Sequence, residues 1–191
     1  MDHIIYLYKE NGGSEYKGSP VTQYQYAMQC YLFAEEFLKE NDKSFDFKRV
    51  SPYEIKLGAF LHDVGYLLEF CNNIKKEEFT ELNRERKGAK YLKELGFSDN
   101  ICSLVENHMN TKRYLMTKDI RYYNNLSVES KKIFSNIGGK MNVDEIYKFE
   151  KDKLFFWHLF LGTWVDKSKS IDHDLLEYIN NYDVKKIFYK I

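Results

Sequence analysis

Apolar residues recur along most of the chain at intervals of three and four, the spacing of a helix that buries one face. In the segment SPVTQYQYAMQCYLFAEEFLKEN, for example, they fall at Val21, Tyr24, Met28 and Leu32. No segment shows a convincing alternation of apolar and polar residues, and no hairpin turn joins two apolar runs. The pattern therefore predicts an all-α fold, a helical bundle of about seven or eight helices.

Start and stop signals indicate where these helices begin and end. Ser19 followed by Pro20, and Ser51 followed by Pro52, are typical of a helix N-terminus, where serine caps the helix and proline fits its first turn. The helix that starts at Ser51 is expected to end near Gly65. The other expected helices start near Thr80, Ser98, Ser127, Asn142, Asp152 and Ser170, with stops at Gly96 and at Gly138–Gly139.

The same pattern describes a single domain over residues 1–191. Residues 1–20 are expected to form a flexible N-terminal lead-in, because the segment ENGGSEYKGSP is rich in glycine and polar residues. Residues 70–79 are expected to form a polar loop. No repeat or low-complexity linker divides the chain, and 191 residues are enough to bury a core without disulfides.

Charge and cysteine content narrow the classes of partner and compartment. The 29 acidic and 29 basic residues balance, so no overall field favours a nucleic acid or a membrane surface. No apolar run approaches the roughly 18 residues of a membrane span, and the N-terminus lacks the features of a signal peptide. Cys30, Cys71 and Cys102 are far apart and lack metal-site spacing. We expect a cytoplasmic protein without nucleic-acid or membrane partners, and a homo-oligomer stays open.

The segment LGAFLHDVGY places His62 and Asp63 side by side in an otherwise apolar run. A buried carboxylate is costly without a partner, so Asp63 needs a cation, a set of hydrogen-bond donors or a metal ion. Histidine and carboxylate together suit iron, manganese or zinc. Adjacent helical residues point about 100° apart, so the two reach one ion only in a tight cluster.

Several segments, in order, resemble the HD-domain superfamily, and most closely its mixed-valent diiron oxygenases that cleave organophosphonates, which are relatives of inositol oxygenase. The resemblance covers most of the chain through VTQYQYAMQCYLFAEE, AFLHDVGYLL, RERKGAKYLKELGF, ENHMNTKRYL and WVDKSK. It implies an all-α HD domain. That family holds two irons with four histidines and two aspartates, and the matching positions here imply metal ligands at His62, Asp63, His108 and Asp166.

Two of the six ligand positions of that family carry other residues in this chain. Tyr26 replaces a histidine of the first site helix, and Arg84 replaces the histidine before the Gly-Ala segment. A guanidinium stays protonated and cannot ligate a metal, but if Arg84 faces the cluster it can pair with Asp63 or Asp166. Tyr26 can bind ferric iron or donate a hydrogen bond to a carboxylate. His158, roughly two turns before Asp166, is the first candidate for a replacement ligand.

The resemblance also implies residues on the substrate side. Lys112, Arg113 and Ser130 match positions that are basic or polar near the phosphonate of the substrate. Tyr16 matches a tyrosine that caps the metal. Lys112 and Tyr16 are therefore candidate catalytic residues, and Lys112, Ser130 and Arg84 are candidate substrate-binding residues.

The combination of kept and replaced ligand positions leaves functions of different classes open. With a degenerate metal site, the protein is a binding or structural module without diiron oxygenase activity; as a sensor it would bind a phosphorylated or phosphonate metabolite, with Arg84 as an anion ligand. The alternative is a metal-dependent enzyme with a reduced, mononuclear site. One iron or manganese ion on His62, Asp63 and Asp166, with Tyr26 as a further ligand, would then act as an oxygenase or phosphohydrolase on a small phosphonate or phosphate compound.

Overall fold

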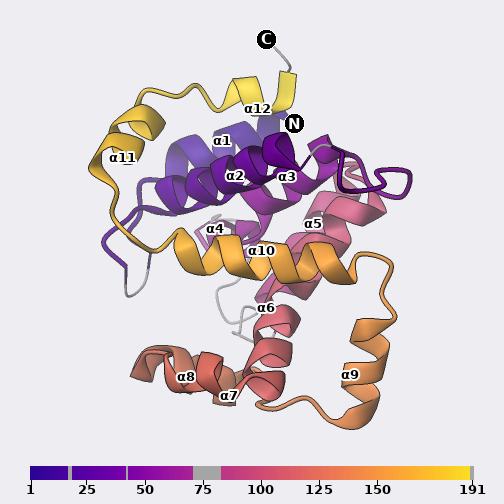
Figure 1. Ribbon diagram of the computed structural model, residues 1–191. Helices are drawn as coiled ribbons and strands as arrows, with labels where there is room; N and C mark the ends of the chain where they lie inside the picture. The colour runs from indigo at the N-terminus through magenta and orange to yellow at the C-terminus, as the bar shows by residue number, and fades with distance from the viewer. Residues whose placement is uncertain (17–18, 42, 71–82, 190–191) are drawn as a thin grey trace.

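The computed structural model describes residues 1–16, 19–41, 43–70 and 83–189, and in these residues it contains twelve helices and no strand (Figure 1). This confirms the all-α prediction. The number of helices exceeds the expected seven or eight partly because α4, α7 and α12 have five residues each, too few for a periodic pattern. The helices are α1 (Asp2–Asn11), α2 (Gln23–Glu40), α3 (Pro52–Leu61), α4 (Val64–Leu68), α5 (Arg84–Glu94), α6 (Asp99–Lys118), α7 (Ile120–Asn124), α8 (Val128–Asn136), α9 (Val143–Glu150), α10 (Phe155–Lys167), α11 (His173–Asn180) and α12 (Lys185–Tyr189).

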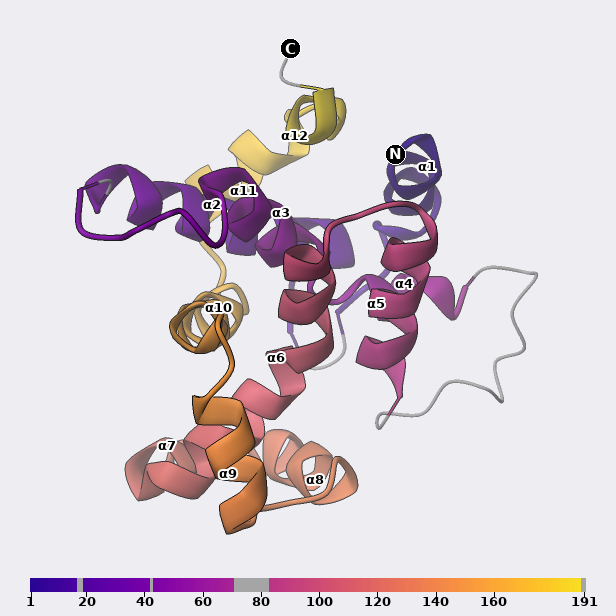
Figure 2. The ribbon, with the colours of Figure 1, turned by 90° about the vertical axis from the view of Figure 1, so that its right-hand side faces the viewer.

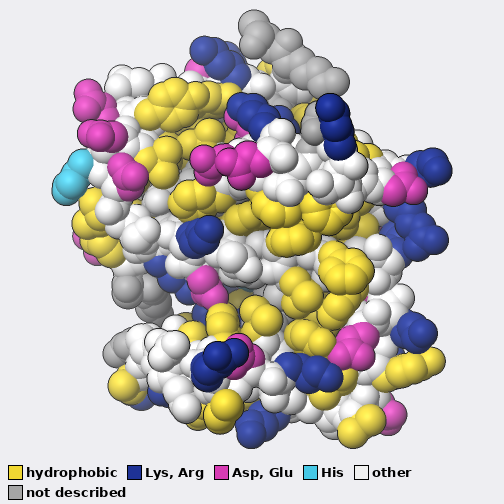
Figure 3. Space-filling view, viewed as in Figure 1, with side chains coloured by type: hydrophobic (Ala, Val, Ile, Leu, Met, Phe, Trp, Pro, Cys, Tyr) yellow, Lys and Arg dark blue, Asp and Glu magenta, His cyan; other side chains and the backbone are white. Residues whose placement is uncertain are grey.

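Helix α6 connects two parts of the molecule (Figures 1 and 2). Its first turns pack against α3 and α5, and α10 crosses it. Its C-terminal end leads into a lower part formed by α7, α8 and α9. On the face in Figure 3, acidic and basic side chains are interspersed around hydrophobic ones. In the described residues, no helix is both long and apolar enough to span a membrane.

The helix starts follow the capping signals where the capping bond is completed. Ser51 accepts a hydrogen bond from the Glu54 amide, and the Glu54 carboxylate accepts one from the Ser51 amide, which starts α3 as expected. The expected start at Ser19 is wrong, because Thr22 caps α2. Thr22 has Gln25 three residues later to return the bond, whereas the hydroxyl of Ser19 donates instead to the Lys169 carbonyl, at 2.9 Å.

The HD pair lies at a break between two helices. Helix α3 ends at Leu61 and α4 begins at Val64, so the single helix expected to reach Gly65 is interrupted. Asp63 has a non-helical backbone, with φ −111° and ψ 20°. Gly65 allows α4 to pack closely against α5, since a Cβ there would lie 2.2 Å from the Arg84 carbonyl oxygen.

The N-terminal residues contribute to the core. The expectation of a flexible lead-in over residues 1–20 differs from the structure, because Asp2–Asn11 form α1. This helix buries Ile4, Ile5, Leu7 and Tyr8, and the Tyr8 hydroxyl donates to the Phe60 carbonyl at 3.0 Å. The apolar spacing of these residues is helical, which the glycines after them obscure.

The remaining expectations concern the cysteines and the segment between Phe70 and Asn83. Cys30 and Cys102 are free and buried. The expected helix start at Thr80, the expected loop beyond Phe70 and Cys71 lie outside the described residues. Helix α5 begins at Arg84 after the N-cap Asn83, and it is followed by Gly96 in the left-handed conformation, φ +84°.

Candidate functional site

A cavity of about 100 Å³ brings together most of the residues that the sequence singles out. They are Tyr16, Tyr26, Asp63, Arg84, His108, Lys112 and Asp166. A wider hollow of about 650 Å³ shares Tyr16, Lys112 and Asp166 with this cavity and extends to Ser130 on α8. The predicted site residues therefore converge from the loop before α2 and from α2, α4, α5, α6, α8 and α10.

His62 and His108 form a buried pair of neutral rings. Their centroids lie 5.2 Å apart with an interplanar angle of 85°. Each Nδ1 bonds to a backbone carbonyl, of Ala59 at 2.8 Å and of Val105 at 3.0 Å, and since a carbonyl only accepts, each Nδ1 donates. Burial lowers the pKa of His62 to about 4 and that of His108 to about 3. The Nε2 of His62 is buried without a hydrogen-bond partner in the described residues.

Asp63 is a carboxylate with too little positive charge around it. Burial, together with the nearby Glu85 carboxylate, raises the pKa of Asp63 to about 7. The charges of Arg84 and Lys169 act in the opposite direction without cancelling this effect.

Tyr26 packs against the HD pair as a neutral phenol. Its ring stacks on Tyr16 with centroids 4.1 Å apart and contacts the edge of His62 at 4.9 Å. Burial, followed by the neighbouring Tyr16 and Asp63, raises the pKa of Tyr26 well above its ordinary value. Burial also raises the pKa of Tyr16. Tyr26 thus fills its position as a hydrogen-bonding aromatic side chain.

Arg84 pairs with Glu69, so the expected pair with Asp63 or Asp166 is wrong. Its Nε donates to Glu69 Oε1 at 2.6 Å, and its guanidinium lies over the Tyr66 ring at 5.1 Å. The close contact of α5 with Gly65 explains this choice. It holds Arg84 alongside α4, whose C-cap is Glu69.

Asp166 has partners at both of its oxygens. The Tyr122 hydroxyl donates to Oδ2 at 2.5 Å, and the Lys169 ammonium donates to Oδ1 at 3.3 Å. Lys112 lies beside Lys169, and burial, then the charge of Lys169, lowers the pKa of Lys112 to about 8. For Lys169 burial acts against the charged form, but Tyr16 and Asp166 outweigh it and raise its pKa.

Sequence reasoning missed Tyr122 and Lys169. A signal existed for Lys169, which follows Asp166 by three residues and can therefore share its side of the helix end. None existed for Tyr122, which lies 44 residues away along the chain.

His158 lies away from the cavity, so its choice as first replacement ligand is wrong. Its ring stacks on Phe149 at 5.5 Å, and its Nε2 lies 3.5 Å from Asp152 Oδ1. Eight helical residues rotate a side chain by about 80° beyond two full turns, which turns His158 away from Asp166.

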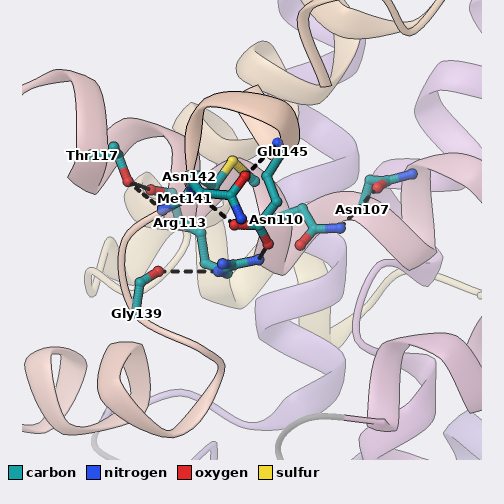
Figure 4. A network of polar contacts seen from close by, with 8 residues as sticks. All are labelled: Asn107, Asn110, Arg113, Thr117, Gly139, Met141, Asn142 and Glu145. Atoms are coloured by element: carbon teal, nitrogen blue, oxygen red, sulfur yellow. Dashed lines mark hydrogen bonds and ion pairs between the residues drawn. The ribbon is translucent and has the colours of Figure 1, made fainter. Parts of the chain in front are cut away.

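Arg113 does not line the cavity, in contrast to the position that the resemblance implies. Figure 4 shows its side chain directed toward Gly139 and Glu145. Its Nε donates to the Gly139 carbonyl at 3.0 Å, and its Nη1 lies 2.8 Å from Glu145 Oε1. Glu145 belongs to the capping box of α9. Arg113 therefore connects α6 to the turn before α9, while its neighbour Lys112 faces the cavity.

Comparison with known proteins identifies the family. Residues 27–135 match the HD domain family. An uncharacterized protein of Acanthamoeba polyphaga mimivirus is 36% identical over 184 residues, which are 95% of this chain and 78% of that protein. The chain belongs to the HD domain family.

Two further relatives of this HD domain carry activities in their names. The 1-hydroxy-2-(trimethylamino)ethylphosphonate dioxygenase (glycine-betaine-forming) of Leisingera caerulea is 30% identical over 152 residues, 80% of this chain and 71% of that enzyme. The hydroxymethylphosphonate dioxygenase of Gimesia maris is 28% identical over 170 residues, 87% of this chain and 76% of that enzyme. They confirm the resemblance to the HD-domain oxygenases.

The described residues of this HD domain do not fit the two irons that the resemblance implies. Within the described ranges, no three His, Cys, Asp or Glu side chains come together as a group that would hold a metal ion. Asp166 is engaged by Tyr122 and Lys169, and Tyr26 is a neutral phenol. Arg84 brings a cation to a ligand position.

Proposed function

We propose that this HD domain is a binding module for a small anion, and that its degenerate metal site supports no diiron oxygenase activity. The observation that carries the proposal is the pair of neighbouring lysines, of which only one is paired with a carboxylate. Lys169 is paired with Asp166, whereas the described residues place no carboxylate within ion-pair distance of Lys112. The Lys112 ammonium therefore faces the cavity without an ion-pair partner.

The ligand class follows from the charge and from the shape of the hollow. Ammonium groups with little water around them bind phosphate or phosphonate oxygens more strongly than exposed ones. Ser130 also lines the hollow and offers a hydroxyl. The names of two relatives specify phosphonates as their substrates, which supports a phosphonate or phosphate compound here.

The absence of diiron chemistry is supported by what the replacement residues do. Tyr26 is stacked on Tyr16, and Arg84 is paired with Glu69, so neither leaves a vacant ligand position. Both side chains are satisfied by protein partners and stabilise the pocket without a metal.

Calorimetric titration tests the proposal. Hydroxymethylphosphonate and inorganic phosphate, each added to metal-free protein, should bind, and Lys112→Met should weaken binding at least about tenfold, the effect of losing a charged contact. Lys167→Met, an exposed lysine of α10, is the matched control and should bind normally. Two metal ions per chain, with oxygen uptake on a phosphonate, would overturn the proposal.

One observation favours the mononuclear enzyme as a second candidate. The Nε2 of His62 is buried without a hydrogen-bond partner in the described residues, which is how an unfilled ligand atom looks. This candidate requires about one iron or manganese per chain, lost in His62→Ala. Mass spectrometry of untagged protein, purified without chelator from metal-supplemented cells, decides between the two.

A further inference from the structure

Lys169 places an ammonium group beside Asp166, in the cavity that Asp63 and His108 also line. Its Nζ lies 3.3 Å from Asp166 Oδ1, and it lines the cavity with Asp63 and His108. Its charge also acts on His62, Asp63 and His108. This is the position from which a bound cation would act on the same groups.

The backbone that carries Lys169 is fixed from two sides. The Ser19 hydroxyl donates to the Lys169 carbonyl at 2.9 Å. The Gln29 amide, which is fully buried on α2, donates to the Ser168 carbonyl at 3.0 Å. These bonds tie the end of α10 to α2 and to the loop before it, so the ammonium is held in the cavity wall.

The other two cations of the cavity do not have this role. Arg84 is paired with Glu69, and the stack on Tyr66 keeps it at the α4–α5 edge. Lys112 lies beside Lys169 and has no carboxylate at ion-pair distance in the described residues. Lys169 is the lysine in contact with Asp166, and its charge reaches Asp63 as well.

We infer that Lys169 is a built-in cation that takes the electrostatic place of a metal ion, and that a divalent cation binds this pocket once the ammonium is removed. The inference rests on the proposed function, in which the native pocket holds no metal. The carboxylates that line the cavity, from Asp63, Glu85 and Asp166, need positive charge nearby to stay ionised away from water. Lys169 supplies such a charge and, unlike a metal ion, has no open coordination position.

The experiment compares three variants with the wild-type protein. Lys169→Met removes the charge and nearly keeps the length of the side chain, Lys169→Arg keeps the charge, and Lys167→Met changes an exposed lysine two residues away, at the end of α10. The midpoint temperature of thermal unfolding, Tm, is measured for each protein in chelator and with Mn²⁺ or Zn²⁺ alone, and the metal bound per chain is measured after desalting. We expect the metal to raise the Tm by about 5 °C, and about one metal ion to stay bound per chain, in Lys169→Met only.

Two results would overturn the inference. One is a wild-type protein that binds Mn²⁺ or Zn²⁺ as well as Lys169→Met does, and the other is a Lys169→Met protein without any metal response. If Lys169→Met does not fold in chelator, Lys169→Gln is refolded with and without Zn²⁺. Recovery with Zn²⁺ supports the inference, and failure with Zn²⁺ overturns it.

A separate measurement distinguishes this inference from the proposed function. Lys112→Met should lose phosphonate binding. Like the wild type, it should show no change in Tm with Mn²⁺ or Zn²⁺. Failure of wild-type phosphonate binding therefore sinks the anion-binding proposal alone. A metal response in Lys112→Met equal to that in Lys169→Met would contradict the assignment of the cation to Lys169.

Discussion

Two of the carboxylates that line the cavity, Asp63 and Asp166, lie in opposite electrostatic environments. Asp166 has a donor at each oxygen, from Tyr122 and from Lys169. Asp63 lies among neutral rings, and its pKa is raised to about 7 because burial and Glu85 outweigh the nearby cations. One end of the cavity is thus well compensated, while the other has a carboxylate that is costly to ionise.

The difference shows what the proposed metal-free site requires of its own residues. His62 and Asp63 lie at the junction of α3 and α4, where α4 packs closely on α5 at Gly65. Positive charge comes from Lys169, just after α10, and from Arg84 on α5. The match to the HD domain family therefore identifies the fold, and the proposal about the metal site depends on these charges.

The largest effect is expected from Asp166→Asn, which breaks the compensated end. The change removes the carboxylate that pairs with Lys169 and leaves the Lys169 ammonium beside that of Lys112. The free energy of unfolding should fall by about 3 kcal/mol, since removal of one partner leaves the other charge unpaired. Urea unfolding at pH 7 measures this change. An unchanged midpoint would show that Asp166 is not the counterion of Lys169.

Asp63→Asn should raise the free energy of unfolding, in contrast to Asp166→Asn. The folded-state pKa of about 7 lies above the ordinary value of about 3.9, so the folded state binds more protons between these values and stability falls as pH rises through them. At pH 8 the variant should be more stable than the wild type by about 2 kcal/mol, and at pH 4 by much less. Lower stability of the variant in metal-supplemented buffer at pH 8 would instead indicate a metal on Asp63.

The sequence predicts what depends on neighbours along the chain. The helix starts at Ser51 and Asn142 are found as expected, and each is completed by a capping box whose partner is only three residues away. The break after Leu61 depends on the contact between Gly65 and Arg84, which local patterns do not contain.

Long-range contacts account for the site residues that sequence reasoning misplaced or missed. Most ligand-type residues were found because a family resemblance aligned them. The hydrogen bonds and ion pairs among them could not be predicted in this way, since residues such as Tyr122 and Asp166 meet only in the folded chain. Arg84 likewise has two acidic candidates in the cavity, and only packing along α4 selects Glu69.

Tyr122→Phe tests the second donor of the compensated end. The loss of a hydrogen bond to a charged carboxylate should cost about 1.5 kcal/mol. Tyr123→Phe, at the next residue of α7, is the matched control and should be nearly neutral. Equal effects of the two substitutions in thermal unfolding would mean that the contact with Asp166 adds nothing.

The smallest effect concerns the pH dependence of anion binding through Lys112. Its pKa of about 8 means that the ammonium is charged below pH 8 and neutral above it. Affinity for methanesulfonate, whose own charge stays constant, should therefore fall about tenfold between pH 7 and pH 9, which is about 1.4 kcal/mol. Lys112→Arg keeps its charge throughout, so its profile should be shallower than that of the wild type and should reflect only the ionisation of Asp63. A wild-type profile no steeper than that of the arginine variant would assign the anion to Lys169, whose pKa is raised, and would remove Lys112 from the binding site.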